Sequence, residues 1–160
     1  DVLGSRGLGD VYKRQRWTVL MPILYIFAGV NGAGKSTLTQ SQFNKVIPYE
    51  INADEISRRN GWDWQDICLL YVGLSSAELA IERVKIRVAN GGHGVRKEMI
   101  KKRYDRSLNT LYELIRKFDS VSIYDNSGDS LIRIYQRIDN KHFMTSELPN
   151  WSRKIIAHDN

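Results

Sequence analysis

A glycine-rich turn that follows an apolar run constrains the fold of this chain more than any other feature. Residues 23–28 read ILYIFA, a continuous apolar run of the kind found in strands buried on both faces of a sheet. Residues 29–36 read GVNGAGKS and match the pattern G-x-x-x-x-G-K-[ST]. A helix is expected from Lys35 to about Lys45. The sequence therefore predicts a strand–loop–helix unit of an α/β fold.

The residue types of this loop suit the binding of phosphate groups. Glycines allow backbone N–H groups to converge on an anion without obstruction by Cβ atoms, and the following helix directs its positive end at the same point. We expect Lys35 to reach the β- and γ-phosphates of a nucleotide and the Ser36 hydroxyl to ligate Mg²⁺. The residues predicted to bind the nucleotide are Gly29, Asn31, Gly32, Ala33, Gly34, Lys35, Ser36 and Thr37.

Strand and helix patterns alternate along the rest of the chain. Further strands are expected at 46–52, 68–74 and 121–125, and a hairpin at 131–146 that turns at Asp139-Asn140. Helices are expected at 54–60, from a capping box of Ser75 and Glu78 to about Asn90, at 96–118, and after Pro149. The core face of the long helix is predicted to hold Ile100, Tyr104, Leu108, Leu111, Ile115 and Phe118. This order predicts a mostly parallel sheet flanked by helices, with a C-terminal β-hairpin.

The first twenty residues differ in character from the rest. The stretch DVYKRQ at 10–15 can be encoded by GAT GTG TAT AAG AGA CAG, which resembles a transposon end used in sequencing-library adapters. We therefore expect residues 1–20 to be a non-native, disordered leader ahead of a natural start at Met21, with an ordinary disordered arm as the alternative. Residues 21–160 are then expected to form one domain.

The composition excludes several other classes of protein. The chain has 160 residues and one cysteine, Cys68, which excludes an internal disulfide bond and a four-cysteine zinc site. The apolar run at 19–30 follows basic residues as in a signal peptide, but it is too short to span a bilayer. It also leads into a loop that needs cytosolic nucleotide. We therefore expect a cytoplasmic protein without a membrane segment.

Basic residues are concentrated in one segment. Residues 83–106 hold nine lysines and arginines against two acidic residues. Such a segment indicates either an anionic partner or a solvated face. A nucleic-acid partner is the less favoured interpretation, because Tyr104 is the one aromatic residue placed among these bases.

The residues after the loop favour a small kinase over a motor or a GTPase. The strand predicted at 68–74 contains no acidic residue that would anchor Mg²⁺, Asp125 comes very late in the chain, and no N-K-x-D motif is present. Asp54 follows the second predicted strand and could accept the proton of a hydroxyl that attacks the γ-phosphate. Its alternative role is to complement a helix dipole.

Four arginines are candidates for neutralising charge during phosphoryl transfer, because guanidinium groups suit a transition state whose charge spreads over three oxygens. The alternative is that they form part of a solvated helical face. They are Arg83, Arg87, Arg96 and Arg103.

Several motifs together resemble the zeta-toxin-like kinases. They are MPILYIFAGVNGAGKSTL, INADEI, YVGLSSAELAIERVKIRVANGGHGV, KKRYDRSL and IYDNS. The resemblance that they anchor extends over residues 21 to about 67 and 68 to 158, nearly all of the chain after the leader. The phosphate loop alone is generic, whereas its combination with NADEI and the YVGLSS segment is specific. The resemblance implies a P-loop kinase fold with ATP and Mg²⁺ as phosphate donor and cofactor. It also implies a UDP-N-acetylamino sugar as acceptor, which suggests UDP-N-acetylglucosamine, and an antitoxin protein as partner.

The same resemblance assigns roles to individual residues. It implies that Lys35 and Ser36 hold phosphates and metal, that Asp54 is the catalytic base, and that Arg83 is the first transition-state arginine. Arg96 has the spacing of the second arginine, but relatives of this subtype usually carry proline there, so Arg103 is the alternative.

The chain departs from the family pattern after Asp54. Thirteen residues separate Asp54 from Cys68, where the family normally has a further segment on the order of a βαβ unit. That segment supplies a strand beside the first one and the residues that grip the acceptor. Its absence puts the acceptor in doubt and makes an inactive ATP-binding remnant the main alternative to a kinase. A natural deletion, an assembly error or a trimmed fragment would each explain the gap.

Overall fold

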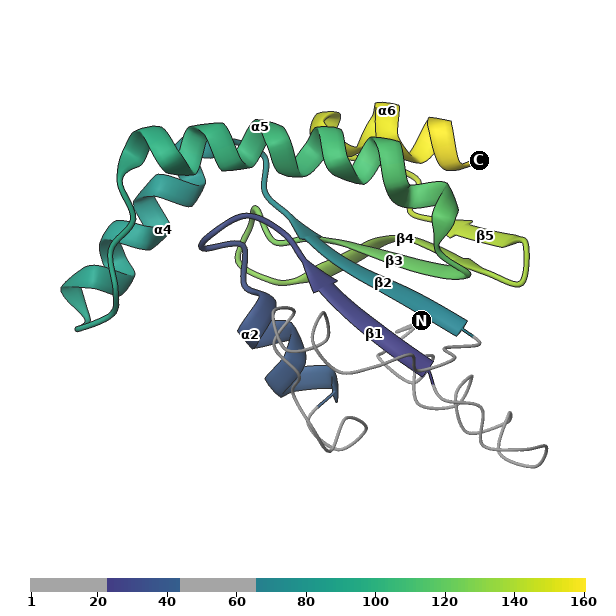
Figure 1. The fold of residues 1–160 in the computed structure, drawn as a ribbon, viewed down its shortest axis with the longest axis horizontal. Coiled ribbons are helices and arrows are strands. Elements are labelled where there is room, and N and C mark those ends of the chain that lie inside the picture. The colour runs from purple at the N-terminus through teal and green to yellow at the C-terminus, as the bar shows by residue number, and fades with distance from the viewer. Residues whose placement is uncertain (1–22, 44–65) are drawn as a thin grey trace, which may run out of the picture.

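The computed structural model describes residues 23–43 and 66–160, which form an α/β fold around one sheet (Figure 1). The five strands lie side by side in chain order. They are β1 (Ile23–Ala28), β2 (Asp66–Gly73), β3 (Ser120–Asp125), β4 (Ile132–Ile138) and β5 (Lys141–Met144).

Helices cover both faces of this sheet. Figure 1 shows α5 and α6 over one face and α2 over the other. The helical elements are α2 (Lys35–Leu38) with its π-helical continuation η1 (Thr39–Phe43), α4 (Ala77–Ala89), α5 (Lys97–Leu114) with the 3₁₀ turn η2 (Ile115–Lys117), and α6 (Asn150–Asp159). None of the helices in the described part of the chain has the length and apolar character needed to cross a membrane.

The sheet is mixed, which corrects the prediction of a mostly parallel one. The pairings of β1 with β2 and of β2 with β3 are parallel, whereas β3 pairs antiparallel with β4 and β4 with β5. The hairpin predicted at the C-terminal end causes the difference, because it adds two antiparallel pairings to a small sheet. Asp139 and Asn140 form its turn with φ values of 49° and 61°, as the sequence predicted. The strand expected at 46–52 and the helix expected at 54–60 lie outside the described residues.

Burial differs between the first two strands. Every residue from Cys68 to Gly73 in β2 is buried, as predicted, and its side chains alternate between the two faces of the sheet. In β1 the predicted burial on both faces is only partial, because its side chains pack against the apolar clusters of both faces but all six residues are half-buried. Among the described strands, β1 pairs with β2 alone, which leaves it at the edge of the described sheet.

The apolar face predicted for α5 is confirmed. Ile100, Leu111 and Ile115 are at most 4% exposed, and the other three predicted core residues pack partly buried against the same apolar clusters. Helix α4 begins one residue later than expected, because Ser76 and not Ser75 is its N-cap. The Ser76 hydroxyl accepts a hydrogen bond from Leu79 N at 3.1 Å, whereas the backbone N–H of Ser75 donates to Ser127 Oγ.

A buried ion pair attaches the end of α6 to the sheet. Arg137 Nε donates to Asp159 Oδ2 at 3.0 Å, and the two side chains are 11% and 1% exposed. The Tyr135 hydroxyl donates to the same oxygen at 2.7 Å. Because that hydroxyl has a single proton, His142 Nδ1, at 2.8 Å, must donate to the tyrosine oxygen. Arg137 also donates to three backbone carbonyls in the segment from η2 to β3, so the network joins that segment to α6 and β4.

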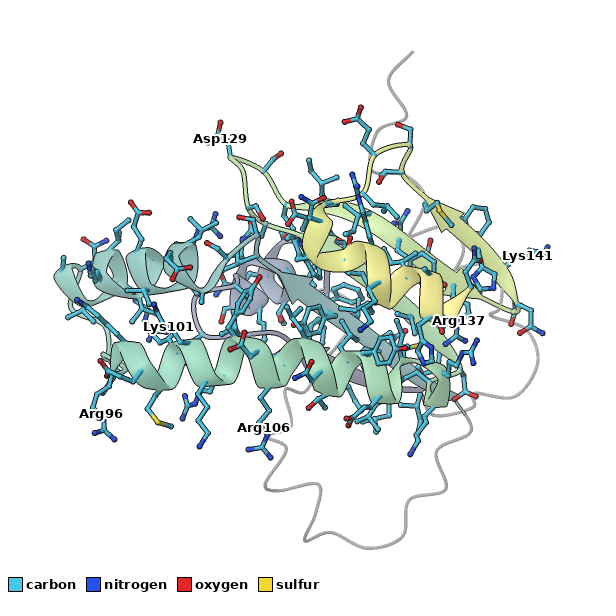
Figure 2. The ribbon with its side chains drawn as sticks, turned by 90° about the horizontal axis from the view of Figure 1, so that it is seen from above. Arg96, Lys101, Arg106, Asp129, Arg137 and Lys141 are labelled. Atoms are coloured by element: carbon cyan, nitrogen blue, oxygen red, sulfur yellow. The ribbon has the colours of Figure 1, made fainter. Side chains whose placement is uncertain are left out.

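Replacing Asp159 should destabilise the fold strongly. Asp159→Ala leaves a buried guanidinium without its counter-ion, which costs about 3 kcal/mol of unfolding free energy. Asp129 is exposed at the opposite side of the molecule (Figure 2), and Asp129→Ala should change stability by less than about 0.5 kcal/mol. Urea unfolding of both variants measures the difference. Equal losses would show that the ion pair contributes nothing specific.

Candidate phosphate-binding site

The glycine-rich loop lies where the sequence predicted it, between β1 and α2. Its glycines adopt backbone conformations that other residues rarely adopt, with φ values of 140° at Gly29, 80° at Gly32 and 96° at Gly34. The Ala33 N–H donates to Val30 O at 3.1 Å and closes the turn. The loop therefore has the compact, glycine-dependent shape that the G-x-x-x-x-G-K-[ST] pattern predicts.

Close packing makes two of these glycines necessary for a second reason. A Cβ on Gly29 would lie 2.3 Å from the backbone oxygen of Val72 in β2, a distance at which backbone would have to move. A Cβ on Gly34 would lie 2.4 Å from Nδ2 of Asn126, the residue that follows β3. The loop is thus seated directly against the ends of the two neighbouring strands.

Lys35 turns back over the loop. Its Nζ donates to Gly29 O at 2.8 Å and to Val30 O at 3.2 Å. Burial lowers the pKa of Lys35 below its usual value, and the nearby positive charge of Arg87 lowers it further. The ammonium group is therefore held at the loop by carbonyl dipoles, in a place where an anion would improve its environment.

Ser36 and Thr37 are both exposed at the start of α2, so their hydroxyls are accessible to a ligand. Within residues 23–43 and 66–160, no group of three His, Cys, Asp or Glu side chains is arranged to hold a metal ion.

The structure brings Arg103 and Arg83 to the loop. Arg103 Nη1, from α5, donates to Asn31 Oδ1 at 3.0 Å. Arg83, from α4, lies beside Gly32, since a Cβ on that glycine would be 3.4 Å from the Arg83 Cβ. The guanidinium group of Arg83 makes a long contact of 3.4 Å with Gly128 O. Both arginines thus lie beside the loop, from different helices.

The other two candidate arginines have different positions. Arg87 acts on Lys35 electrostatically, and its Nη2 donates to His93 O at 2.7 Å. Arg96 precedes α5 and points away from the rest of the molecule (Figure 2). It forms no side-chain hydrogen bond or ion pair with another described residue. Of the two residues considered for the second transition-state arginine, Arg103 lies at the loop and Arg96 does not.

Asn126 is a site residue that sequence reasoning missed. Its Nδ2 donates to Ala33 O at 2.9 Å, and its backbone N–H donates to Gly73 O at 3.0 Å. Asn126 therefore connects the phosphate loop to the ends of both β2 and β3. The sequence feature that could have identified Asn126 is its position just after a buried strand, at the carboxyl edge where ligands bind in α/β sheets.

The sequence offered two acidic candidates near the loop, of which the structure describes Asp125. Asp54 lies outside the described residues. Asp125 Oδ1 accepts hydrogen bonds from Ser127 Oγ at 2.6 Å and from Trp151 Nε1 at 2.9 Å, so this carboxylate holds α6 in place. Comparisons of the chain with known protein families, with curated proteins and with solved structures gave no match. The family resemblance therefore rests on the sequence motifs alone.

Substitution of Gly29 should disrupt the loop far more than substitution of Gly91. Both glycines have positive φ, but nothing lies within 4 Å of a Cβ on Gly91. Gly91→Ala should therefore cost only the backbone strain, about 1 kcal/mol. Gly29→Ala adds the clash with Val72 O and should cost about 3 kcal/mol or more. Urea unfolding compares the two, and equal costs would contradict the close approach of the loop to β2.

Proposed function

We propose that this protein is an ATP-dependent kinase that transfers the γ-phosphate of ATP to a hydroxyl group of a small acceptor. The observation that carries the proposal is the gathering of Lys35, Arg83 and Arg103 around a glycine loop at the carboxyl edge of the sheet. Phosphoryl transfer depends mainly on positioning and on stabilisation of negative charge, and these residues suit both tasks.

The residues of the loop fit ATP and Mg²⁺. Backbone N–H groups of Gly32 and of residues 34–36 would hold the phosphates, and the Lys35 ammonium would exchange its two carbonyl partners for phosphate oxygens. Ser36 would ligate Mg²⁺, which neutralises phosphate charge when bound. Arg103 is the better candidate for the second transition-state arginine, because it already reaches Asn31 in the loop.

The acceptor is proposed from the resemblance to the zeta-toxin-like kinases. The same resemblance gives Asp54 the role of accepting the proton of the attacking hydroxyl. The acceptor to test first is UDP-N-acetylglucosamine, and a protein antitoxin would be the partner in a cytoplasmic setting. The principal alternative is an ATP-binding remnant without transfer, which is motivated by the few residues between Asp54 and Cys68.

A nucleic-acid role is favoured less than the kinase. Of the basic residues at 83–106, Arg83 and Arg103 lie beside the loop, and Lys101 pairs with Glu78 at 3.1 Å. The segment therefore does not present one uninterrupted basic face. Phosphate-driven binding to a nucleic acid would also weaken by decades between low and physiological salt, which a titration would detect.

ATP binding should depend on Lys35. At one hundred times its dissociation constant, Mg²⁺·ATP should stabilise the protein by about 2.7 kcal/mol, which corresponds to a shift of several degrees in Tm. Lys35→Ala should remove most of that shift, whereas Lys97→Ala, at an exposed lysine of α5, should keep it. Differential scanning fluorimetry measures all three proteins. A full shift in Lys35→Ala would refute ATP binding by this loop.

Measurements of phosphate transfer should show which of Arg96 and Arg103 acts as the second transition-state arginine. Arg103→Gln should reduce transfer from γ-labelled ATP to UDP-N-acetylglucosamine by about a hundredfold or more, because charge stabilisation by an arginine near the loop is lost. Arg96→Gln should remain close to the unmodified protein, because Arg96 has no contact with the loop. The reverse order of the two variants would contradict the proposed role of Arg103.

Asp54 provides the test that distinguishes a kinase from a remnant. Asp54→Asn should abolish transfer to UDP-N-acetylglucosamine while retaining the thermal shift with Mg²⁺·ATP, because a base is lost and the phosphate loop is intact. Transfer that survives the substitution would exclude Asp54 as the base. Failure of the unmodified protein to phosphorylate any tested hydroxyl compound, with the ATP shift present, would favour the remnant.

A further inference from the structure

A groove separates α5 from the first two strands on the sheet face opposite α2. Its volume is about 430 Å³, within the range of sites for small molecules. Ile26 and Ala28 of β1 and Leu69 of β2 form its floor, and Leu111 and Leu114 of α5 form its wall.

The charged groups among the described residues of this groove have the same sign. Arg103 and Arg106 line it, and no acidic side chain of residues 23–43 or 66–160 does. Neither arginine forms an ion pair with a described residue. Arg106 also forms no side-chain hydrogen bond with one, and Figure 2 shows it projecting from α5 on the side away from α6. Two guanidinium groups beside an apolar floor favour a ligand that carries negative charge at one end.

Two of the uncharged polar groups that line the groove are paired with each other. Ser107 Oγ and the Tyr71 hydroxyl lie 2.9 Å apart, and both residues line the groove. Burial raises the pKa of Tyr71 to about 12, so its hydroxyl stays neutral at physiological pH. Arg103, Arg106 and Thr110 are the exposed groups among the described lining residues that can donate hydrogen bonds to an anion.

We propose that this groove is a binding site for a small anionic amphiphile, whose apolar body lies on β1 and β2 and whose phosphate or carboxylate group is held by Arg103 and Arg106. The inference does not depend on the proposed kinase activity, because the groove lies under α5 and does not include Lys35 or the other residues of the glycine loop. Arg103 is the residue that the two sites share, since it also donates to Asn31.

Binding of n-octyl phosphate tests this site directly. Calorimetric titration of the full chain, below the micelle concentration, should show one-to-one binding of n-octyl phosphate and much weaker binding of n-octyltrimethylammonium, whose charge is opposite. Arg106→Gln should weaken n-octyl phosphate binding by about tenfold, the effect of losing one charge-assisted hydrogen bond. Thr110→Trp, which fills the groove from an exposed position on α5, should abolish it.

Matched controls distinguish binding in this groove from binding at the glycine loop and from nonspecific binding. Lys102→Gln removes one positive charge from the same helix outside the groove and should leave binding unchanged. Lys35→Ala should also leave it unchanged, because the glycine loop is not used. Equal binding of the two amphiphiles, or loss of binding in Lys35→Ala, would overturn the proposal. If circular dichroism shows that Thr110→Trp does not fold, unchanged binding of n-octyl phosphate by Arg106→Gln is sufficient to overturn the proposal.

Discussion

The parallel alignment of β1, β2 and β3 determines where the glycine loop and the residues around it lie. Because the three strands run in the same direction, the segments that follow them meet at one edge of the sheet. The loop after β1, Ser75 after β2 and Asn126 after β3 are all found there. The hydrogen bond from Asn126 to Ala33 O, and the contact of Gly29 with the backbone of Val72, connect these segments directly.

Helices α4 and α5 then place positive charge at the same edge. Helix α4 starts from the end of β2 and carries Arg83 past Gly32, while α5 returns over the sheet and carries Arg103 to Asn31. Tyr104 helps to set this position, because its hydroxyl donates to Leu74 O at 2.9 Å. The cationic groups near the glycine loop thus come from rigid helices that are anchored to the strand ends, which is the arrangement that charge stabilisation requires.

Local patterns predicted much of this fold. The loop, the apolar stripe of α5, the buried β2 and the hairpin at Asp139-Asn140 each depend on residues that are close together in the chain. Features that depend on contacts between residues far apart in the chain were not predicted. The half-burial of β1 depends on its place in the described sheet, and the choice of Ser76 as N-cap depends on Ser127, which holds the backbone of Ser75. Asn126 reaches a loop more than ninety positions earlier, a contact that no single-sequence pattern shows.

A crystal structure with Mg²⁺ and a non-hydrolysable ATP analogue would show whether the glycine loop is a nucleotide phosphate site. We expect the triphosphate on the N–H groups of Gly32 and of residues 34–36, with Lys35 Nζ moved from Gly29 O to phosphate oxygens and Arg103 within reach of the γ-phosphate. Triphosphate bound elsewhere, or a Lys35 ammonium that keeps both carbonyl partners while nucleotide is present, would contradict it.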